Sequence, residues 1–221
     1  MQNLTQKTLK TTVLIGVLTM MSAPLTPAFA GTNAFDSVAE FSNTQGAGGW
    51  SYGYYSMPGN ATSFTVMTYY GAVGPSVWSE SFNTPPWTLL WADGGHPNGP
   101  NSGSVHDVVR RWTSGATGTL NIMGSHSMGD SGSTEVSVVV NGSAIWSSLP
   151  NGASQSFSAS SDVVAGTLVD FVINSNGVDY NDRTNFAVKG AVTAVPEVGT
   201  NVLLLAGLGA LGFIGRRRRL G

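Results

Sequence analysis

Residues 136–146 read VSVVVNGSAIW. Valine occupies alternate positions within 136–140, which places one row of apolar side chains on one face of a strand. Asn141 and Gly142 follow, and this pair favours a type I′ turn because both central residues of that turn need positive φ. A second β-rich run begins at once, at 144–146. The stretch therefore predicts a β-hairpin.

The same alternation recurs along the chain, in short runs separated by Gly, Pro, Asn and Ser. Helical periodicity is missing between residues 31 and 194. The further predicted strands are 64–70, 76–82, 88–91, 105–113, 120–124, 155–159, 169–173 and 186–192. About nine or ten strands with turns every ~8–12 residues indicate an all-β, antiparallel β-sandwich.

Four of these runs have a characteristic order and spacing. They are VVRRWT at 108–113, LNI at 120–122, VSVVVNG at 136–142 and VDFV at 169–172. The region from 87 to 193 resembles the jelly-roll domains, related to carbohydrate-binding modules, of exported bacterial proteins. The resemblance implies a jelly-roll-like β-sandwich. It implies a fold more than an activity, because such sandwiches host many functions.

The N-terminus has the three parts of a secretory signal. A basic start precedes an apolar run at 13–21, and Ala28 and Ala30 frame a small-x-small cleavage site. We therefore predict a signal peptide over residues 1–30, removed by signal peptidase. An uncleaved anchor helix is the alternative, and the shortness of the apolar run argues against it.

The C-terminus, residues 195–221, also has three parts. They are a short motif (Val195, Pro196 and Glu197), an uncharged apolar segment (198–215) and a basic end (Arg216, Arg217, Arg218 and Arg219). A helix over the apolar segment would span roughly 27 Å, close to the ~30 Å hydrocarbon core of a bilayer. The arginines would stay on the cytoplasmic side. We expect a single transmembrane helix here; a buried C-terminal helix is the alternative.

This three-part end resembles the PEP-CTERM sorting domain of Gram-negative bacteria, over residues 195–219. The resemblance implies processing by an exosortase, a membrane protease-transferase. Val198 stands where the family usually has a second proline, so cleavage at this motif is a point to test. The expected product is an exported protein, held in the inner membrane as a precursor and then placed on the cell surface or in the extracellular matrix.

The segment between the two signals, residues 31–194, is long enough for one domain with a real core. It keeps four basic and eleven acidic side chains, a net charge of −7. Nucleic acid is therefore excluded as a natural partner, whereas cations and neutral sugars stay open. The chain has no cysteine, so the core must stabilise the domain without disulfides.

Side chains with oxygen atoms crowd the segment 174–182. They are Asn174, Asn176, Asp179, Asn181 and Asp182. Calcium takes six to eight oxygen ligands, and the segment joins two predicted strands, so it is a candidate structural calcium site. Its spacing does not match an EF-hand loop, and a solvated turn is the other interpretation. No other cofactor is expected.

Aromatic residues offer a surface for sugars, because their faces stack on the apolar faces of sugar rings. Tyr52 and Tyr54 share one face of a predicted strand, and we assign Trp50 and Tyr55 to the surface. His96 precedes the predicted strand 105–113 in a His-Pro pair. It either bonds to backbone or joins Trp50 and Tyr55 in a ligand surface. Core packing is the alternative for each aromatic residue.

No motif for catalysis is present. The spacings of His96, His106 and His126 match no zinc signature, and Ser131 lacks the Gly-x-Ser-x-Gly elbow of a nucleophile. We therefore predict a non-enzymatic cell-surface or extracellular-matrix protein, with polysaccharide as the ligand to consider. Two alternatives stay open. One is an exported polysaccharide-directed hydrolase with a hidden pair of carboxylates, and the other is a structural surface protein without a ligand.

Overall fold

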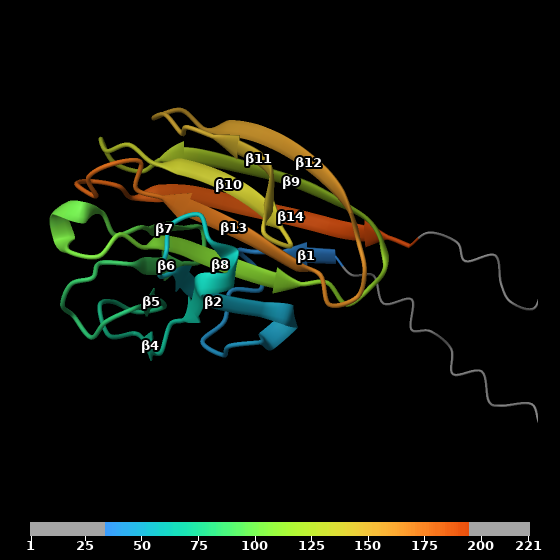
Figure 1. The fold of residues 1–221 in the computed structure, drawn as a ribbon, viewed down its shortest axis with the longest axis horizontal. Coiled ribbons are helices and arrows are strands. Elements are labelled where there is room, and N and C mark those ends of the chain that lie inside the picture. Colours follow the sequence, from blue (N-terminus) through green and yellow to red (C-terminus); the bar gives the residue numbers. More distant parts are fainter. Residues whose placement is uncertain (1–33, 195–221) are drawn as a thin grey trace, which may run out of the picture. The chain divides into compact units, whose positions relative to one another are not determined.

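The computed structural model describes residues 34–194, which form two antiparallel β-sheets packed face to face (Figure 1). One sheet has eight strands in the order β12-β9-β14-β7-β6-β5-β4, with β1 paired to β14. The other has six strands in the order β11-β10-β13-β8-β2-β3. The predicted signal peptide, sorting motif, transmembrane helix and basic end lie outside the described residues. Within 34–194, no helix is long and apolar enough to cross a membrane.

The strands are mostly short in the first half of this region and longer in the second. They are β1 (Ala34–Asp36), β2 (Trp50–Tyr55), β3 (Phe64–Val66), β4 (Tyr69–Tyr70), β5 (Trp78–Ser79), β6 (Leu89–Trp91), β7 (Gly94–His96), β8 (Asp107–Thr113), β9 (Gly118–Met128), β10 (Glu135–Val140), β11 (Ser143–Ser148), β12 (Gln155–Val163), β13 (Leu168–Asn174) and β14 (Thr184–Thr193). Three 3-10 turns join them: η1 (Ala47–Gly49), η2 (Ala61–Ser63) and η3 (Pro100–Ser102).

The last eight strands have jelly-roll order. Four of them, β7-β14-β9-β12, lie in one sheet, and β8-β13-β10-β11 lie in the other. The chain therefore changes sheet at every connection in this part except the hairpin from β10 to β11, as two interlocked Greek keys require. The predicted all-β, jelly-roll-like sandwich is confirmed.

The hairpin at Asn141 and Gly142 is also confirmed. Both residues have positive φ, 46° and 84°, and Val140 pairs with Ser143 across the two-residue loop. The alternation before the turn places Val136 and Val138 in the core between the sheets.

Two residues that we expected on the surface are buried. Trp50 lies on the same face of β2 as Tyr52, because residues two apart in a strand share a face, and both pack in the core between the sheets. Tyr55 points to the opposite face, as its position requires. There Ala61 and Phe64 pack over it. The exposed fraction of Trp50 and of Tyr55 is 1%. The prediction of a ligand surface at Trp50 and Tyr55 is therefore wrong.

Some short strands also differ from prediction. The run 64–70 is divided into β3 and β4, and between them Met67 turns into the core, where its backbone N–H donates to the carbonyl of Tyr52. Strand β7 contains Gly94 and Gly95, which carry no β pattern. A Cβ atom at Gly94 would lie 2.0 Å from the carbonyl oxygen of Thr184, so the close approach of β14 requires glycine there.

Candidate functional site

A cavity of about 350 Å³ opens between loops from three parts of the chain. We call it the Trp87–Tyr180 pocket. Its lining residues are Trp87, Leu89, His96, Ser102, Asp179, Tyr180 and Asn181. The first three come from β6, β7 and the residues just before β6. Ser102 lies in η3, and the last three lie in the loop from β13 to β14.

Backbone contacts fix the Trp87 side of the pocket. The N–H of Trp87 donates to Asn98 Oδ1 over 2.8 Å, and His96 Nδ1 lies 3.2 Å from the carbonyl oxygen of Trp87. Asn98 is fully buried and exchanges two backbone hydrogen bonds with His106. His96 is therefore bonded to backbone and also lines the pocket, so the two roles considered for it coexist.

Asp179 ties the opposite loop to η3. Its Oδ2 accepts from the N–H of Gly99 over 2.9 Å, and its Oδ1 accepts from Ser102 Oγ over 3.1 Å and from the Asn101 side chain. Burial alone would raise the pKa of Asp179, but these hydrogen bonds and the nearby His96 outweigh burial and hold the pKa below its ordinary value. Asp179 is thus an ionised anchor that orients the loop carrying Tyr180.

Aromatic side chains flank the pocket. Tyr180 is 69% exposed, which is unusual for a large aromatic residue held in an ordered loop, and Trp87 is half-buried. Ser102, Asn181 and His96 line the same cavity and bring hydroxyl, amide and imidazole groups to it. Aromatic faces beside a few hydrogen-bonding groups suit a ligand with apolar faces and hydroxyl edges.

The five residues of the predicted calcium site are placed as follows. Asn174 donates to Asp107, Asn176 donates to Ser133, and Asn181 donates weakly to Ser131. Asp179 is engaged as described above. Asp182 Oδ1 accepts from the N–H of Ser133 over 2.9 Å.

These side chains are hydrogen-bonded to different partners. Within residues 34–194, no three His, Asp or Glu side chains are grouped so as to hold a metal ion. Among the side-chain atoms of these five residues, Asp182 Oδ2 is buried without a hydrogen-bond partner. Burial, and next the charge of Asp179, raise the pKa of Asp182 to about 6. A calcium site in this loop stays a prediction.

Sequence reasoning selected His96, Asp179 and Asn181 for separate reasons, and the structure brings them into one pocket. It passed over Trp87 and Tyr180. Tyr180 stands inside a run of Asn and Asp residues, where a solvated turn needs no aromatic side chain, and that mismatch is the signal that could have found it.

A second pocket, of about 240 Å³, contains two carboxylates on the outer face of the six-stranded sheet. Strand register places Asn174 opposite Glu135, and the side chain of Asn174 donates a hydrogen bond to Asp107 Oδ1. Burial raises the pKa of Asp107, although hydrogen bonds from Gly59 N–H and Asn174 oppose this rise. The sequence showed no motif linking Asp107 with Glu135, because only the pairing of β8, β13 and β10 joins them.

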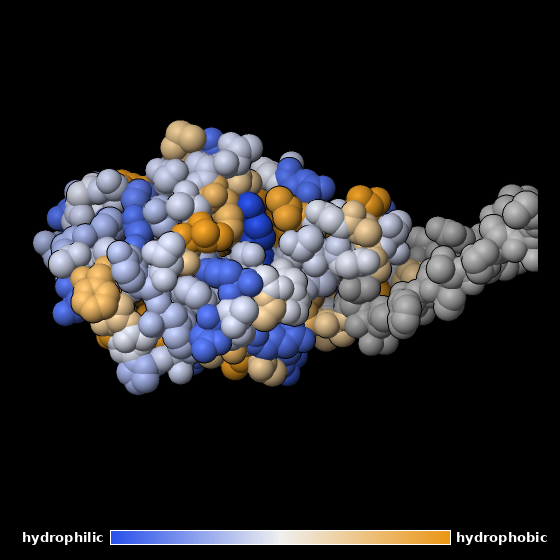
Figure 2. Space-filling view, turned by 90° about the horizontal axis from the view of Figure 1, so that it is seen from below, coloured by the Kyte–Doolittle hydropathy of each residue, from blue (hydrophilic) through white to orange (hydrophobic). Residues whose placement is uncertain are grey.

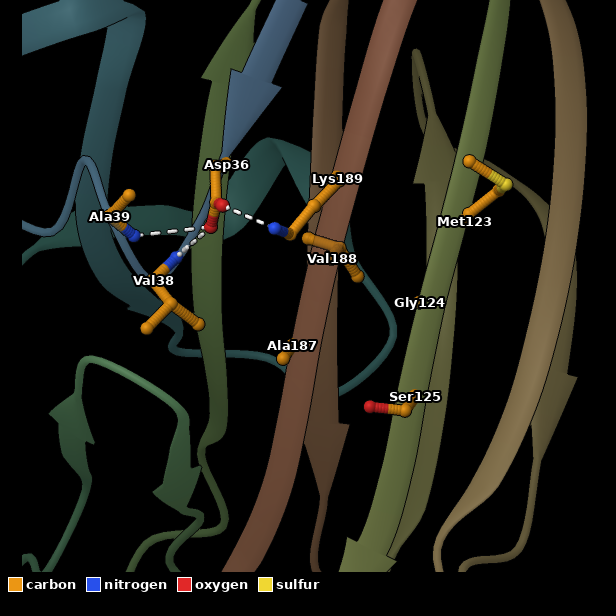
Figure 3. Close-up of a pocket in the computed structure, with 9 residues that line it drawn as sticks. All are labelled: Asp36, Val38, Ala39, Met123, Gly124, Ser125, Ala187, Val188 and Lys189. Atoms are coloured by element: carbon orange, nitrogen blue, oxygen red, sulfur yellow. Dashed lines mark hydrogen bonds and ion pairs between the residues drawn. The ribbon is translucent and has the colours of Figure 1, made fainter.

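Another cavity, of about 530 Å³, lies on the outer face of the eight-stranded sheet (Figure 3). Met123, Val38 and Ala187 give it an apolar wall and floor, and an ion pair of 2.8 Å between Lys189 and Asp36 closes one end. Lys189 and Asp36 neutralise each other in this ion pair. The cavity therefore has few hydrogen-bonding groups left for a ligand.

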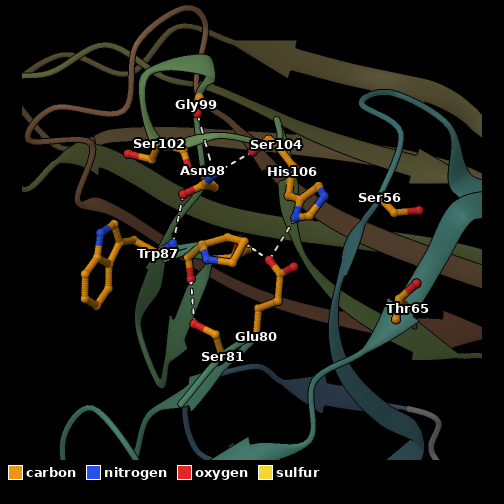
Figure 4. Close-up of polar contacts among 12 residues, drawn as sticks. Ser56, Thr65, Glu80, Ser81, Trp87, Asn98, Gly99, Ser102, Ser104 and His106 are labelled. Atoms are coloured by element: carbon orange, nitrogen blue, oxygen red, sulfur yellow. Dashed lines mark hydrogen bonds and ion pairs between the residues drawn. The ribbon is translucent and has the colours of Figure 1, made fainter. Parts of the chain in front are cut away.

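Glu80 and His106 form a polar cluster next to the Trp87–Tyr180 pocket (Figure 4). His106 Nδ1 lies 2.8 Å from Glu80 Oε2, which also accepts from Thr88 Oγ1 over 2.6 Å. Tyr54 stacks on the His106 ring with 4.8 Å between the ring centroids. The cluster joins β2, the residue after β5 and the loop before β8, and the bond from Thr88 connects it to the residue next to Trp87.

Residues 194–219 match the family described as the PEP-CTERM protein-sorting motif. This confirms the resemblance found in the sequence and indicates an exported, membrane-anchored precursor that is a substrate for exosortase processing. The match covers the C-terminal segment alone. No curated protein matches the chain.

Several solved structures are distantly similar. A family 35 carbohydrate-binding module from Cellvibrio japonicus is 16% identical, with 51% of this chain and 80% of that chain covered and a TM-score of 0.30. A family 35 module from Clostridium thermocellum is 9% identical, with 46% and 75% covered and a TM-score of 0.29. Pika GITRL is 18% identical, with 46% and 96% covered and a TM-score of 0.30. Similarities this low carry no argument about function.

Proposed function

We propose that this chain is an exported cell-surface or extracellular-matrix protein whose β-sandwich binds a neutral polysaccharide, without catalysing a reaction, through the Trp87–Tyr180 pocket. The observation that carries the proposal is that two aromatic residues, Trp87 and Tyr180, line one cavity together with Ser102, Asn181 and His96. The sorting motif at 194–219 supports delivery of the domain to the cell exterior, where such polymers are found.

The chemistry of the pocket favours a neutral sugar over an acidic one. Stacking on Trp87 and Tyr180 needs a ring with an apolar face, and Ser102 and Asn181 can exchange hydrogen bonds with its hydroxyl groups. Asp179 beneath them is ionised, and the domain carries a net charge of −7, so a polyanion would be repelled.

The test is affinity electrophoresis of the full chain, in detergent, through gels that contain neutral or acidic polysaccharides. We expect retardation by at least one neutral polymer, and a loss of about tenfold in affinity for Tyr180→Ala and for Trp87→Ala. Phe82→Ala is the matched control, because Phe82 is an equally exposed aromatic residue (65%) that does not line the pocket. Retardation unchanged by Tyr180→Ala would overturn the assignment of the site.

Processing of the sorting signal is proposed as well. Strand β14 ends at Thr193 and the motif match begins at 194, so the domain leads almost directly into Pro196 and Glu197. Mass spectrometry of the protein released by the producing cells should give a chain that begins at Gly31 and ends near this motif. A released chain that keeps residues 198–221 would show that Val198 prevents cleavage.

A hydrolase is the second candidate, and the pair Asp107 and Glu135 favours it. The two residues lie two strands apart, which places their backbones roughly 10 Å from each other. Inverting glycosidases also use two carboxyl groups that face one cavity, and the pKa of their acid is raised, as burial raises the pKa of Asp107. Release of reducing sugar by the full chain, abolished by Glu135→Gln, would support this alternative over simple binding.

A further inference from the structure

Strand β12 (Gln155–Val163) forms one edge of the eight-stranded sheet (Figure 1). It pairs with β9 through nine consecutive residues without a shift in register. Within the described part of the chain, no backbone hydrogen bond joins its other side to a further strand. Nine residues thus present an unbroken row of backbone groups to the solvent.

The other sheet edges are short or irregular. Strand β4 has two residues and β3 has three. Strand β11 has six, and its pairing with β10 shifts register between Val138 and Val139, which twists this edge. Short length and bulges are two of the means by which β-proteins prevent edge-to-edge pairing. Strand β12 uses neither.

Its sequence, QSFSASSDV, also lacks the residues that block an edge. It contains no Lys, Arg, Pro or Gly, and its one charge is Asp162, which accepts a hydrogen bond from Thr119 Oγ1 over 2.9 Å. The outward row consists of Ser156, Ser158 and Ser160, which are small and exposed. A second strand could therefore approach without a steric or electrostatic barrier.

We infer that β12 pairs with β12 of a second copy of this chain, antiparallel and about a two-fold axis at Ala159. With this centre Ser158 lies opposite Ser160 of the partner copy. Asp162 lies opposite Ser156, so the two like charges of the edges do not face each other. All nine residues then pair, and the two eight-stranded sheets become one continuous sheet.

A second copy of the chain is the favoured partner for β12, because the strand is complementary to itself under rotation about the two-fold axis at Ala159. An isologous pair of this kind also closes, since each copy has one such edge, and so it gives a dimer and not a filament. The interface is one strand wide, and the domains that it joins both carry a charge of −7. The association is therefore weak, and it strengthens with protein concentration and with salt.

The absence of native cysteine makes the register testable with single thiols in the full chain. In the inferred register, a mixture of the Ser158→Cys and Ser160→Cys variants forms a disulfide-linked dimer under mild oxidation. Each variant alone forms little, because its two thiols lie two residues out of register, beyond the reach of a disulfide. Equal cross-linking of each variant alone would overturn the register with its centre at Ala159.

Charge substitution tests the dimer itself by sedimentation in detergent. The double variant Ser158→Lys/Ser160→Lys places lysines opposite lysines and is expected to remain monomeric, as is Ser158→Glu/Ser160→Glu. Mixing the two variants is expected to restore the dimer. Both positions are exposed, and unchanged melting of each variant verifies its fold. A dimer that persists in the lysine variant, or a wild-type chain that is monomeric at all concentrations, would overturn the inference.

Discussion

Tyr55, Arg111 and Asp170 form a buried polar cluster on the outer face of the six-stranded sheet. The hydroxyl of Tyr55 donates to Asp170 Oδ2 over 2.5 Å, and Arg111 donates to both oxygens of Asp170 over 2.7 and 2.8 Å. Arg111 also donates to the carbonyl of Ala61 and lies 3.9 Å from the ring centre of Phe64. This cluster fastens the segment 56–66 to the sheet and explains why Tyr55 is not a surface residue.

The Asp170→Asn variant should be strongly destabilised. It leaves the Arg111 guanidinium largely buried without its counter-charge, which typically costs about 3–5 kcal/mol of unfolding free energy. Tyr55→Phe removes one hydrogen bond to a charged group and should cost about 1.5–3 kcal/mol. Urea unfolding measures both. Asp130→Asn, at an exposed position, is the control and should change little; an equal loss there would contradict the role of the cluster.

The stability of the folded domain should depend on pH through His126. Burial lowers the pKa of His126, and its Nδ1 is buried without a partner. The folded state therefore binds a proton less readily than the unfolded state. The contribution of His126 to stability is complete above its unfolded pKa of about 6.5 and is lost as pH falls below that value.

The melting temperature of the wild-type chain should therefore fall between pH 7.5 and pH 5 by more than that of His126→Gln. The difference between the two chains is the quantity to measure, because other groups titrate in the same range. The fluorescence of Trp146, whose ring centre lies 5.3 Å from that of His126, provides a local signal. Parallel melting curves for the two chains would contradict the prediction.

At the scale of elements, alternation in the sequence found the long strands and the hairpin from β10 to β11. It missed β1 and β7, because three residues carry too little pattern and because β7 is made of glycine and histidine. It joined β3 and β4 into one strand, since the inward turn of Met67 that separates them depends on a contact with β2. The site was only partly predictable, because loops far apart in the sequence meet there through the jelly-roll order.

The hairpin turn offers a test of backbone strain. Gly142 has a φ of 84° and space for a methyl group, since the nearest atom, Ala61 Cβ, would lie 3.8 Å away. Gly142→Ala should therefore cost about 1 kcal/mol through strain and not through a clash. Gly152→Ala is the matched control: its added Cβ meets nothing within 4 Å and its φ is not positive, so no loss is expected. Chemical denaturation of both variants distinguishes the two cases.

The loop from β13 to β14 can be tested for calcium directly. Asp179 accepts protein hydrogen bonds on both oxygens and Asp182 accepts one, and if the loop is a solvated turn the melting temperature is the same in calcium and in EDTA. If the loop does bind the ion, the folded state is stabilised and the melting temperature rises with calcium concentration. A rise abolished by Asp182→Asn would identify Asp182 Oδ2 as a ligand and overturn the interpretation of a solvated turn.

At the scale of the whole molecule, the chain combines an acidic β-sandwich with a sorting motif at its C-terminal end. Hydrophobic residues on the face in Figure 2 are scattered in small groups among polar ones, so this face has no broad apolar surface for a protein partner. The features suited to binding are local: the Trp87–Tyr180 pocket and the edge strand β12. The two proposed ligands, a polymer and a second copy of the chain, therefore bind at separate places.

The central claim is that the Trp87–Tyr180 pocket binds a neutral polysaccharide, and affinity electrophoresis of three chains tests it most directly. The account predicts that the wild-type chain and Phe82→Ala are retarded to the same degree by a neutral polymer, and that Tyr180→Ala is retarded about tenfold less. Equal mobility of all three chains in every polysaccharide gel would contradict it.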